Sequence, residues 1–460
     1  MKTNNTTITT PIADFIRQYH ENGTARFHMP GHKGHGFMDI EHLDITEITG
    51  ADALYEAGGI IAESEANATL LFNSGCTVYS AEGSSQCIKA MLRLATMSWQ
   101  KNNTGRPVIL AARNVHKAFV YGAALLDLDV CWLYSDNFED AFRNNILSCI
   151  ISPIALEKQL SAMAVKPAAV YITSPDYLGN IADIACIADI CHKYNTLLLV
   201  DNAHGAYLHF LDKPAHPLDL GADMCCDSAH KTLPALTGAA YLHVSKNIEV
   251  SYKNNITEHV KEAMVMFGST SPSYLIMSSL DYCNKYLAEN YKADLSRFIE
   301  LLNNIKVQYP ELICDSDPLR LTIKRTSLHT GIELGAMLKK YNAEYEYADD
   351  DYLVLMLTPS NDIKDLDIIQ RFLDDIKDEI LITNNDFLTF AKPEKALSIH
   401  DAIMCEYQTL PIEECLGKIC ASPLVACPPA IPIVISGEII NESCIKLFKK
   451  YNIKEARVVI

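Results

Sequence analysis

The clearest indication of the fold is the stretch Asp227-Ser228-Ala229-His230-Lys231-Thr232-Leu233, which follows the short apolar run 222–226. A glycine-bearing turn and another apolar run come after it. A lysine at the end of a buried strand can form a Schiff base, because partial desolvation of its ammonium group lowers its pKa. Ser228 and His230 on either side offer hydrogen-bond donors of the kind that a phosphate requires. On these residues alone, a surface lysine near a core histidine remains an alternative.

Short apolar runs alternate with helical stretches on both sides of this segment. The runs have the length and composition of buried strands: 108–111, 131–134, 169–173, 197–200 and 239–243. Between two of them, apolar residues recur at helical spacing, at Ile181, Ile184, Ile187, Ala188 and Cys191. This alternation is typical of βαβ units, so we expect an α/β domain with a mostly parallel sheet covered by helices on both faces.

Three further groups follow strands or begin helices of this expected sheet. Asp201 ends the run 197–200, and a carboxylate there can pair with the ring nitrogen of a pyridine cofactor. Gly83, Ser84 and Ser85 precede a helix and offer backbone and hydroxyl donors to a phosphate. His116 follows the run 108–111, where an imidazole can stack on a ring or transfer a proton. Each also has a plainer interpretation as a helix cap or helix-start residue.

Taken together, these groups resemble the fold-type I pyridoxal-phosphate enzymes, and more narrowly the ornithine/lysine/arginine decarboxylase family. The similarity covers nearly the whole chain. It is carried by FHMPGHKG (27–34), the turn 83–86, RNVHK (113–117), SPDYLGNIADI (174–184), DNAHGAY (201–207), SAHKTLPALTG (228–238), STSPSY (269–274) and PPAIPIVISGE (428–438).

The resemblance implies a fold-type I large domain with a mostly parallel sheet of the seven-stranded type and a smaller C-terminal α+β region. It also assigns roles to individual residues. Lys231 forms the Schiff base, Asp201 pairs with the ring nitrogen, Ala203 lies under the ring beside His204, and His116 stacks on its face. The phosphate is held by Ser84, Ser85, Ser228 and His230, beside Gly83. Thr270 or Ser271 reaches the phosphate of a neighbouring subunit, so the active unit is at least a dimer, with shared active sites.

The chain also departs from the family pattern. The turn reads GSSQ where a GST-type turn is more usual, Asn202 stands where an acid is common, and Cys427 precedes the proline pair where a tyrosine is frequent. We expect no receiver-like domain ahead of the core, so the chain resembles the short form of the family. None of these departures removes a group that the chemistry requires.

Composition limits the classes of partner. The 460 residues carry 39 basic and 57 acidic side chains, a formal charge of −18, which argues against a nucleic-acid binder. The 15 cysteines include no C-x-x-C pair, and we expect them to be reduced core residues of a cytoplasmic protein. No apolar stretch is long enough to span a bilayer. Four histidines lie between residues 28 and 42, but their spacing matches no standard metal site, and we expect no metal.

We therefore expect a pyridoxal-phosphate-dependent decarboxylase of arginine, lysine or ornithine, working as a homodimer or a larger homo-oligomer. The catalytic residues would be Lys231, His116 and His230. Glu438 is the candidate for the distal cation of the substrate, although it can equally cap the helix that begins near Asn441. The alternatives are a transaminase, with Arg320 or Arg325 clamping the α-carboxylate, and a non-catalytic regulator. The expected divisions are an N-terminal arm (1–60), a cofactor domain (61–310), a small α+β domain (311–390) and a C-terminal subdomain (391–460).

Overall fold

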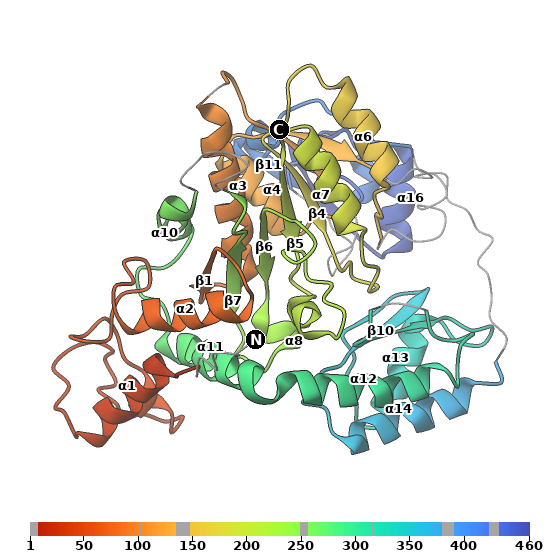
Figure 1. The fold of residues 1–460 in the computed structure, drawn as a ribbon. Coiled ribbons are helices and arrows are strands. Elements are labelled where there is room, and N and C mark those ends of the chain that lie inside the picture. Colours follow the sequence, from red (N-terminus) through yellow and green to blue (C-terminus); the bar gives the residue numbers. More distant parts are fainter. Residues whose placement is uncertain are drawn as a thin grey trace. The chain divides into compact units, whose positions relative to one another are not determined.

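The computed structural model describes residues 8–101, 103–134, 148–248, 256–314, 317–379, 391–422 and 432–460. The chain divides into two compact units. Figure 1 labels most of the helices and strands along the chain. The first contains residues 1–103 and 197–293, and the second contains residues 104–196 and 294–460. The larger sheet has seven strands, four of them in the first unit and three in the second.

The four strands of the first unit lie in the order β1-β7-β6-β5, where β5 and β6 are parallel and β7 is antiparallel to both β6 and β1. Their bounds are β1 Cys76–Ser80, β5 Leu197–Asp201, β6 Met224–Asp227 and β7 Ala240–Val244. Every residue of β5, β6 and β7 is buried. Strands covered on both faces read as continuous apolar runs, which is why the sequence revealed these three.

Helices of the first unit pack on this part of the sheet. α3 contacts β5, β6, β7 and β1, α2 contacts β1, and α1 contacts α11 and α2. The helices are α1 Pro11–Glu21, α2 Ile60–Leu71, α3 Ser84–Gln100, α8 Ala229–Thr232, α10 Val260–Val265 and α11 Tyr274–Tyr286. Shorter helical turns are η1 Glu41–Leu43, η2 Ala206–Phe210, η3 Thr257–His259 and the π-helical η4 Leu287–Tyr291.

In the second unit, three parallel strands lie in the order β4-β2-β3. They are β2 Val108–Ala112, β3 Asp129–Leu133 and β4 Ala169–Thr173. The expectation of an α/β fold with a mostly parallel seven-stranded sheet is confirmed. Helices α4 Lys117–Leu125, α6 Pro153–Ala162 and α7 Ile184–Lys193 alternate with these strands along the chain.

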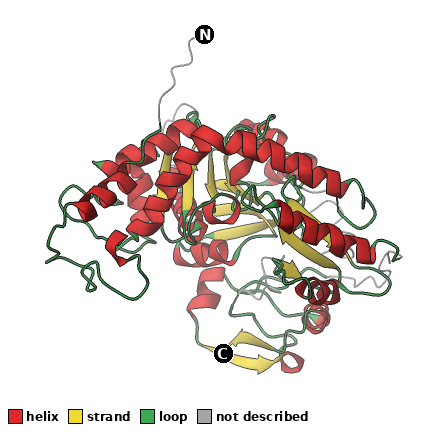
Figure 2. Ribbon diagram, turned by 90° about the horizontal axis from the view of Figure 1, so that it is seen from below, coloured by secondary structure: helices red, strands yellow, loops and turns green. Residues whose placement is uncertain are grey.

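The rest of the second unit forms two small sheets. The first is antiparallel, in the order β8-β10-β9, and contains β8 Arg320–Lys324, β9 Tyr347–Ala348 and β10 Tyr352–Met356. The second is the antiparallel pair of β11 Tyr407–Pro411 and β12 Glu455–Val459, which lies beside the C-terminus in Figure 2. The helices here are α12 Lys292–Lys306, α13 Gly331–Lys339, α14 Ile363–Ile376, α15 Ile399–Met404, η5 Ile412–Glu414 and α16 Glu442–Lys450.

Among the described residues, no helix is both long enough and apolar enough to cross a bilayer.

Candidate active site

Lys231 lies on the short helix α8, just after β6 ends at Asp227. Its side chain is half-buried, and its Nζ is 2.9 Å from Nε2 of His204. His204 is itself 6% exposed and follows the end of β5. The ends of two parallel strands therefore bring a lysine and an imidazole into direct contact.

His230, the neighbour of Lys231, has a different environment. Its Nδ1 donates a hydrogen bond to the backbone oxygen of Ala239 at 2.9 Å. Burial lowers the pKa of His230, so the ring is neutral near pH 7 and its Nε2 is then an acceptor. His230 must take up a proton before Nε2 can donate to a phosphate.

Asp201 is the last residue of β5 and is 2% exposed. Its Oδ1 accepts a hydrogen bond from the backbone N–H of Ala203 at 3.2 Å and lies 3.8 Å from Sγ of Cys226. Ala203 is buried and has only a methyl side chain. A buried carboxylate next to a small residue is suited to a flat heteroaromatic ring that carries a protonated nitrogen.

The turn before α3 has the features of a phosphate cradle. Gly83 has a φ of +71°, a conformation that L side chains rarely adopt, and a Cβ placed there would meet no atom within 4 Å. Ser84 then begins a helix of 17 residues, whose first backbone N–H groups have no partner within the helix. Ser228 donates to Ser84 through their Oγ atoms at 2.9 Å, which joins this turn to the Lys231 segment.

These groups together suit pyridoxal phosphate. The first unit provides an amine on Lys231, a buried carboxylate on Asp201 and hydroxyl donors beside a helix N-terminus at Ser84 and Ser85. They match the aldehyde, the pyridine nitrogen and the phosphate of that cofactor.

Thr270 and Ser271 are exposed on the loop that precedes α11. The N–H of Ser271 donates to Oγ of Ser269 at 3.1 Å. Their predicted contact with the phosphate of a second subunit stays a prediction.

His116 and Glu438 belong to the second unit. His116 is the N-cap of α4, where its Nδ1 accepts a hydrogen bond from the N–H of Ala118 at 3.2 Å. Its predicted stacking on a cofactor ring stays a prediction. Glu438 accepts hydrogen bonds from both terminal nitrogens of Arg113 and from the N–H of Ile435. It also lines a cavity of about 250 Å³ together with Trp132 and Tyr134.

The two arginines that a transaminase might use have structural partners. Arg320 is 1% exposed, donates to the backbone oxygens of Asp176 and Tyr177, and lies 3.3 Å from the carboxylate of Asp317. Arg325 lies 3.7 Å from the carboxylate of Asp351.

Sequence reasoning missed a buried cluster directly behind the Lys231 segment. The carboxylate of Asp227 accepts hydrogen bonds from Nε2 of His216 at 3.0 Å and from Nε2 of His243 at 3.1 Å. All three side chains are fully buried. A signal was present, because His243 and Asp227 are polar residues within otherwise apolar strands, but only pairing of the strands brings them together.

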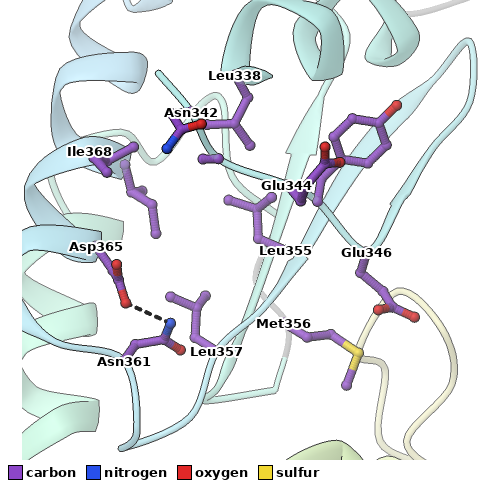
Figure 3. Close-up of a pocket in the computed structure, with 13 residues that line it drawn as sticks. Leu338, Asn342, Glu344, Glu346, Leu355, Met356, Leu357, Asn361, Asp365 and Ile368 are labelled. Carbon is purple, nitrogen blue, oxygen red and sulfur yellow. Dashed lines mark hydrogen bonds between the residues drawn. The ribbon is translucent and has the colours of Figure 1, made fainter. Parts of the chain in front are cut away.

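A second cavity, of about 390 Å³, lies on the small antiparallel sheet between residues of α13, β10 and α14 (Figure 3). Leu355 and Leu357 form part of its apolar lining, and Asn361 donates to Asp365 at 2.9 Å at one side. None of the site residues predicted from the sequence lines this cavity.

Comparison with known proteins agrees with the chemistry of the first unit. Residues 10–313 match the family model of the Orn/Lys/Arg decarboxylase major domain, and residues 383–455 match that of the C-terminal domain. An arginine decarboxylase of Bacillus subtilis is 27% identical over 96% of this chain and 93% of its own length. The uncharacterised YaaO protein of the same species is 28% identical over 97% of this chain and 95% of its own length.

Solved structures show the same fold. The lysine decarboxylase LdcF of Francisella novicida superposes with a TM-score of 0.78 at 14% identity, over 98% of this chain and 81% of that one. The constitutive lysine decarboxylase of E. coli gives a TM-score of 0.77 at 17% identity, over 98% and 82%. The family models cover well over half of the sequence, and the chain belongs to the Orn/Lys/Arg decarboxylase family, whose members are pyridoxal-phosphate-dependent enzymes.

Proposed function

We propose that the protein removes the α-carboxylate of a basic L-amino acid, namely arginine, lysine or ornithine, to give carbon dioxide and the corresponding amine. The observation that carries the proposal is the grouping of Lys231, His204 and Asp201 at the ends of β5 and β6, beside the Ser84–Ser228 contact. The family match and the arginine decarboxylase relatives support the choice of reaction and of substrate class.

Each residue of the first unit has a proposed task. Lys231 attaches the cofactor, Asp201 keeps its ring nitrogen protonated, and Ser84, Ser85 and Ser228 hold its phosphate. Pyridoxal phosphate, when bound, supplies an aldehyde and a ring that withdraws electrons from the substrate's α-carbon.

Lys231 then transfers a proton. When the carboxylate leaves as carbon dioxide, the α-carbon needs one proton in its place. Lys231 is the proposed donor, and His204 is positioned to exchange a proton with its Nζ. We assign this exchange to His204 in preference to His230, because the Nδ1 proton of His230 is directed at the backbone of Ala239.

The substrate's distal cation needs an acid, and Glu438 is still our candidate. The cavity that it lines also contains Tyr134, which supports a position near a ligand. Against this, both of its carboxylate oxygens already accept hydrogen bonds from Arg113. His116 keeps its proposed place on the ring face.

We further propose a homodimer or larger homo-oligomer in which Thr270 or Ser271 completes the neighbouring site, and a cytoplasmic location. Exposure of these two residues on a loop is consistent with the first proposal. None of the 14 described cysteines is in a disulfide, which supports the second. The domain boundaries at residues 60, 310 and 390 also remain part of the proposal.

The decisive experiment measures carbon dioxide release from arginine, lysine, ornithine and a set of neutral amino acids by the protein reconstituted with pyridoxal phosphate. We expect release from at least one basic amino acid and none from the neutral ones. Lys231→Ala should abolish both the release and the visible absorbance of the bound cofactor. Transfer of the amino group to a keto acid without gas release would indicate a transaminase, and a wild-type protein that binds no cofactor would indicate a regulator.

A further inference from the structure

The buried cluster behind Lys231 has no part in the chemistry described above. Its centre is Asp227, whose Oδ2 accepts hydrogen bonds from His216 and His243 and whose Oδ1 accepts one from Nδ2 of Asn202 at 2.6 Å. All four side chains are fully buried. A carboxylate so far from water requires a specific reason to be there, because burial of a charge is costly unless hydrogen bonds compensate it.

The hydrogen bonds define the charge of each member. Nδ1 of His216 accepts from the backbone N–H of Leu218 at 3.4 Å, so its proton is on Nε2, which faces Asp227. Burial lowers the pKa of His243 and keeps that ring neutral. Burial alone would raise the pKa of Asp227, but the two imidazoles outweigh it and hold the pKa below its ordinary range. The cluster is therefore one carboxylate that accepts hydrogen bonds from two imidazoles and one amide.

Asn202 makes this carboxylate relevant to the active site. It lies between Asp201 and the pair Ala203 and His204, and its own N–H donates to the backbone oxygen of Cys226 at 3.0 Å. Asp227, at the other end of the Asn202 contact, directly precedes Ser228 and lies four residues before Lys231. One buried carboxylate thus connects the turn that presents Asp201 to the segment that presents Lys231.

The same contact explains why an amide stands at position 202. An acid there would place a second carboxylate 2.6 Å from that of Asp227, inside a protein interior where like charges repel strongly. An amide donates a hydrogen bond instead. The identities of residues 202 and 227 are therefore physically coupled in this chain.

We propose that Asp227 is a positioning residue for the decarboxylation, which acts through Asn202 to fix the turn from Asp201 to His204 against the Lys231 segment. The inference rests on the proposed function only in assigning the cofactor to Lys231 and Asp201. A metal ion is the competing explanation, because the ligand atoms of His216, Asp227 and His243 lie within 4.8 Å of one another. We favour the hydrogen-bonded arrangement because each imidazole already directs an Nε2 proton at the carboxylate.

The test compares Asp227→Asn with Asp223→Asn in the reconstituted holoenzyme. Asp223 is a matched control because it is also a buried carboxylate of the β5–β6 pair, where it accepts a hydrogen bond from the N–H of Leu198 at the far end of the strands. The readouts are thermal stability, kcat and KM, and the visible circular dichroism of the bound cofactor, which reports the orientation of its ring.

We expect Asp227→Asn to lower kcat by about 10- to 100-fold with KM changed much less, and to alter the visible circular dichroism. Asp223→Asn should lose stability only. Because Asp227→Asn can fail to fold, Asn202→Ala provides a second measurement that leaves the carboxylate and both imidazoles in place, and it should shift the circular dichroism in the same direction. Asn202→Asp alone places two carboxylates against each other and should reduce the visible circular dichroism of the cofactor. Adding Asp227→Asn restores one donor and one acceptor across the contact, so the double variant should recover part of that circular dichroism.

Three outcomes would overturn the proposal. One is an Asn202→Ala protein with wild-type kcat and wild-type circular dichroism. Another is equal loss of stability, without any change in the cofactor signal, in the Asp227 and Asp223 variants. The third is a stoichiometric metal in the wild-type protein that Asp227→Asn lacks. If the wild-type protein binds the cofactor but decarboxylates none of the tested amino acids, the proposed function fails, while the circular dichroism still decides the role of Asp227.

Discussion

Arg113 and Glu438 form a bidentate ion pair, with both N–O distances at 2.7 Å and side chains that are 1% and 6% exposed. They are 325 positions apart in the sequence, and the pair ties the end of β2 to the segment before α16 within the second unit. The guanidinium also lies over the ring of Trp132, 5.0 Å from its centroid. Burial alone would lower the pKa of Arg113, but the carboxylate of Glu438 outweighs this effect and raises the pKa.

Glu438→Gln should therefore destabilise the protein strongly. Removal of one partner of a buried ion pair leaves an uncompensated charge, and we expect the free energy of unfolding to fall by about 3–5 kcal/mol in urea denaturation. Arg106→Ala is the control, because it breaks an ion pair with Asp127 whose side chains are 40% and 44% exposed, and it should lower the free energy of unfolding far less than Glu438→Gln does.

The same variant tests the role of Glu438 in substrate binding. If Glu438 contacts the distal cation, Glu438→Gln raises KM for the basic substrate far more than it changes the cofactor spectrum. An unchanged KM would remove Glu438 from the substrate site, and an unfolding free energy within about 1 kcal/mol of the wild-type value would contradict the structural role of the pair.

Asp281 predicts a distinct pH dependence of stability. Burial raises the pKa of this carboxyl to about 6, against an ordinary value of 3.8. Its oxygens accept from the backbone N–H of Ala13 on α1 and from Oγ of Ser64 on α2. The folded state therefore binds a proton more tightly than the unfolded state does, and the stabilisation from protonated Asp281 is lost as the pH rises from about 4 to above 6.

The measurement is the difference in unfolding free energy between the wild-type protein and Asp281→Asn. We expect the unfolding free energy of the wild-type protein, relative to that of Asp281→Asn, to fall by about 2 kcal/mol between pH 4 and pH 7.5. A difference that stays constant across this pH range would contradict the raised pKa of Asp281.

A side chain at Gly268 should destabilise the protein. A Cβ at this position would collide with Oη of Tyr55 and Nε2 of Gln86. Gln86 is in the first turn of α3, where it donates to Tyr55 at 2.9 Å and to the backbone oxygen of Met264 at 2.8 Å. We expect Gly268→Ala to cost about 1–3 kcal/mol of stability and to weaken the affinity for pyridoxal phosphate, measured by absorbance titration.

Two further variants test whether the cost of Gly268→Ala comes from this collision. Gly58→Ala adds a Cβ that meets no atom within 4 Å, and it should leave both quantities near their wild-type values. Tyr55→Phe removes the nearest colliding atom, so Gly268→Ala should cost less in that background. An equal cost in both backgrounds would rule out the collision with Tyr55.

The helices and buried strands could be predicted from the sequence because their signal is local. The run 169–173 is β4 residue for residue, and most of the helical spacing between Ile181 and Cys191 lies in α7, because continuous apolar runs and helical periodicity can be read directly along the sequence. β1 was not predicted, because Thr77 and Ser80 interrupt its apolar pattern. Both side chains are buried, and each forms a hydrogen bond in the fold. Thr77 pairs with His243, which is 166 positions away, and Ser80 donates to Gln86, which follows the next turn.

The candidate site divides in the same way. The sequence by itself determined the residue types and their places at strand ends: Lys231 after β6, Asp201 at the end of β5, and Gly83 before α3. The tertiary structure decided which partner each side chain has. It brings His204 to Lys231, directs His230 to a backbone oxygen, pairs Glu438 with Arg113 and joins Asp227 to Asn202, His216 and His243. The physical reason is that apolar periodicity depends on residues close together in the sequence. Hydrogen bonds between buried polar groups depend instead on which strands and loops lie next to each other in the fold.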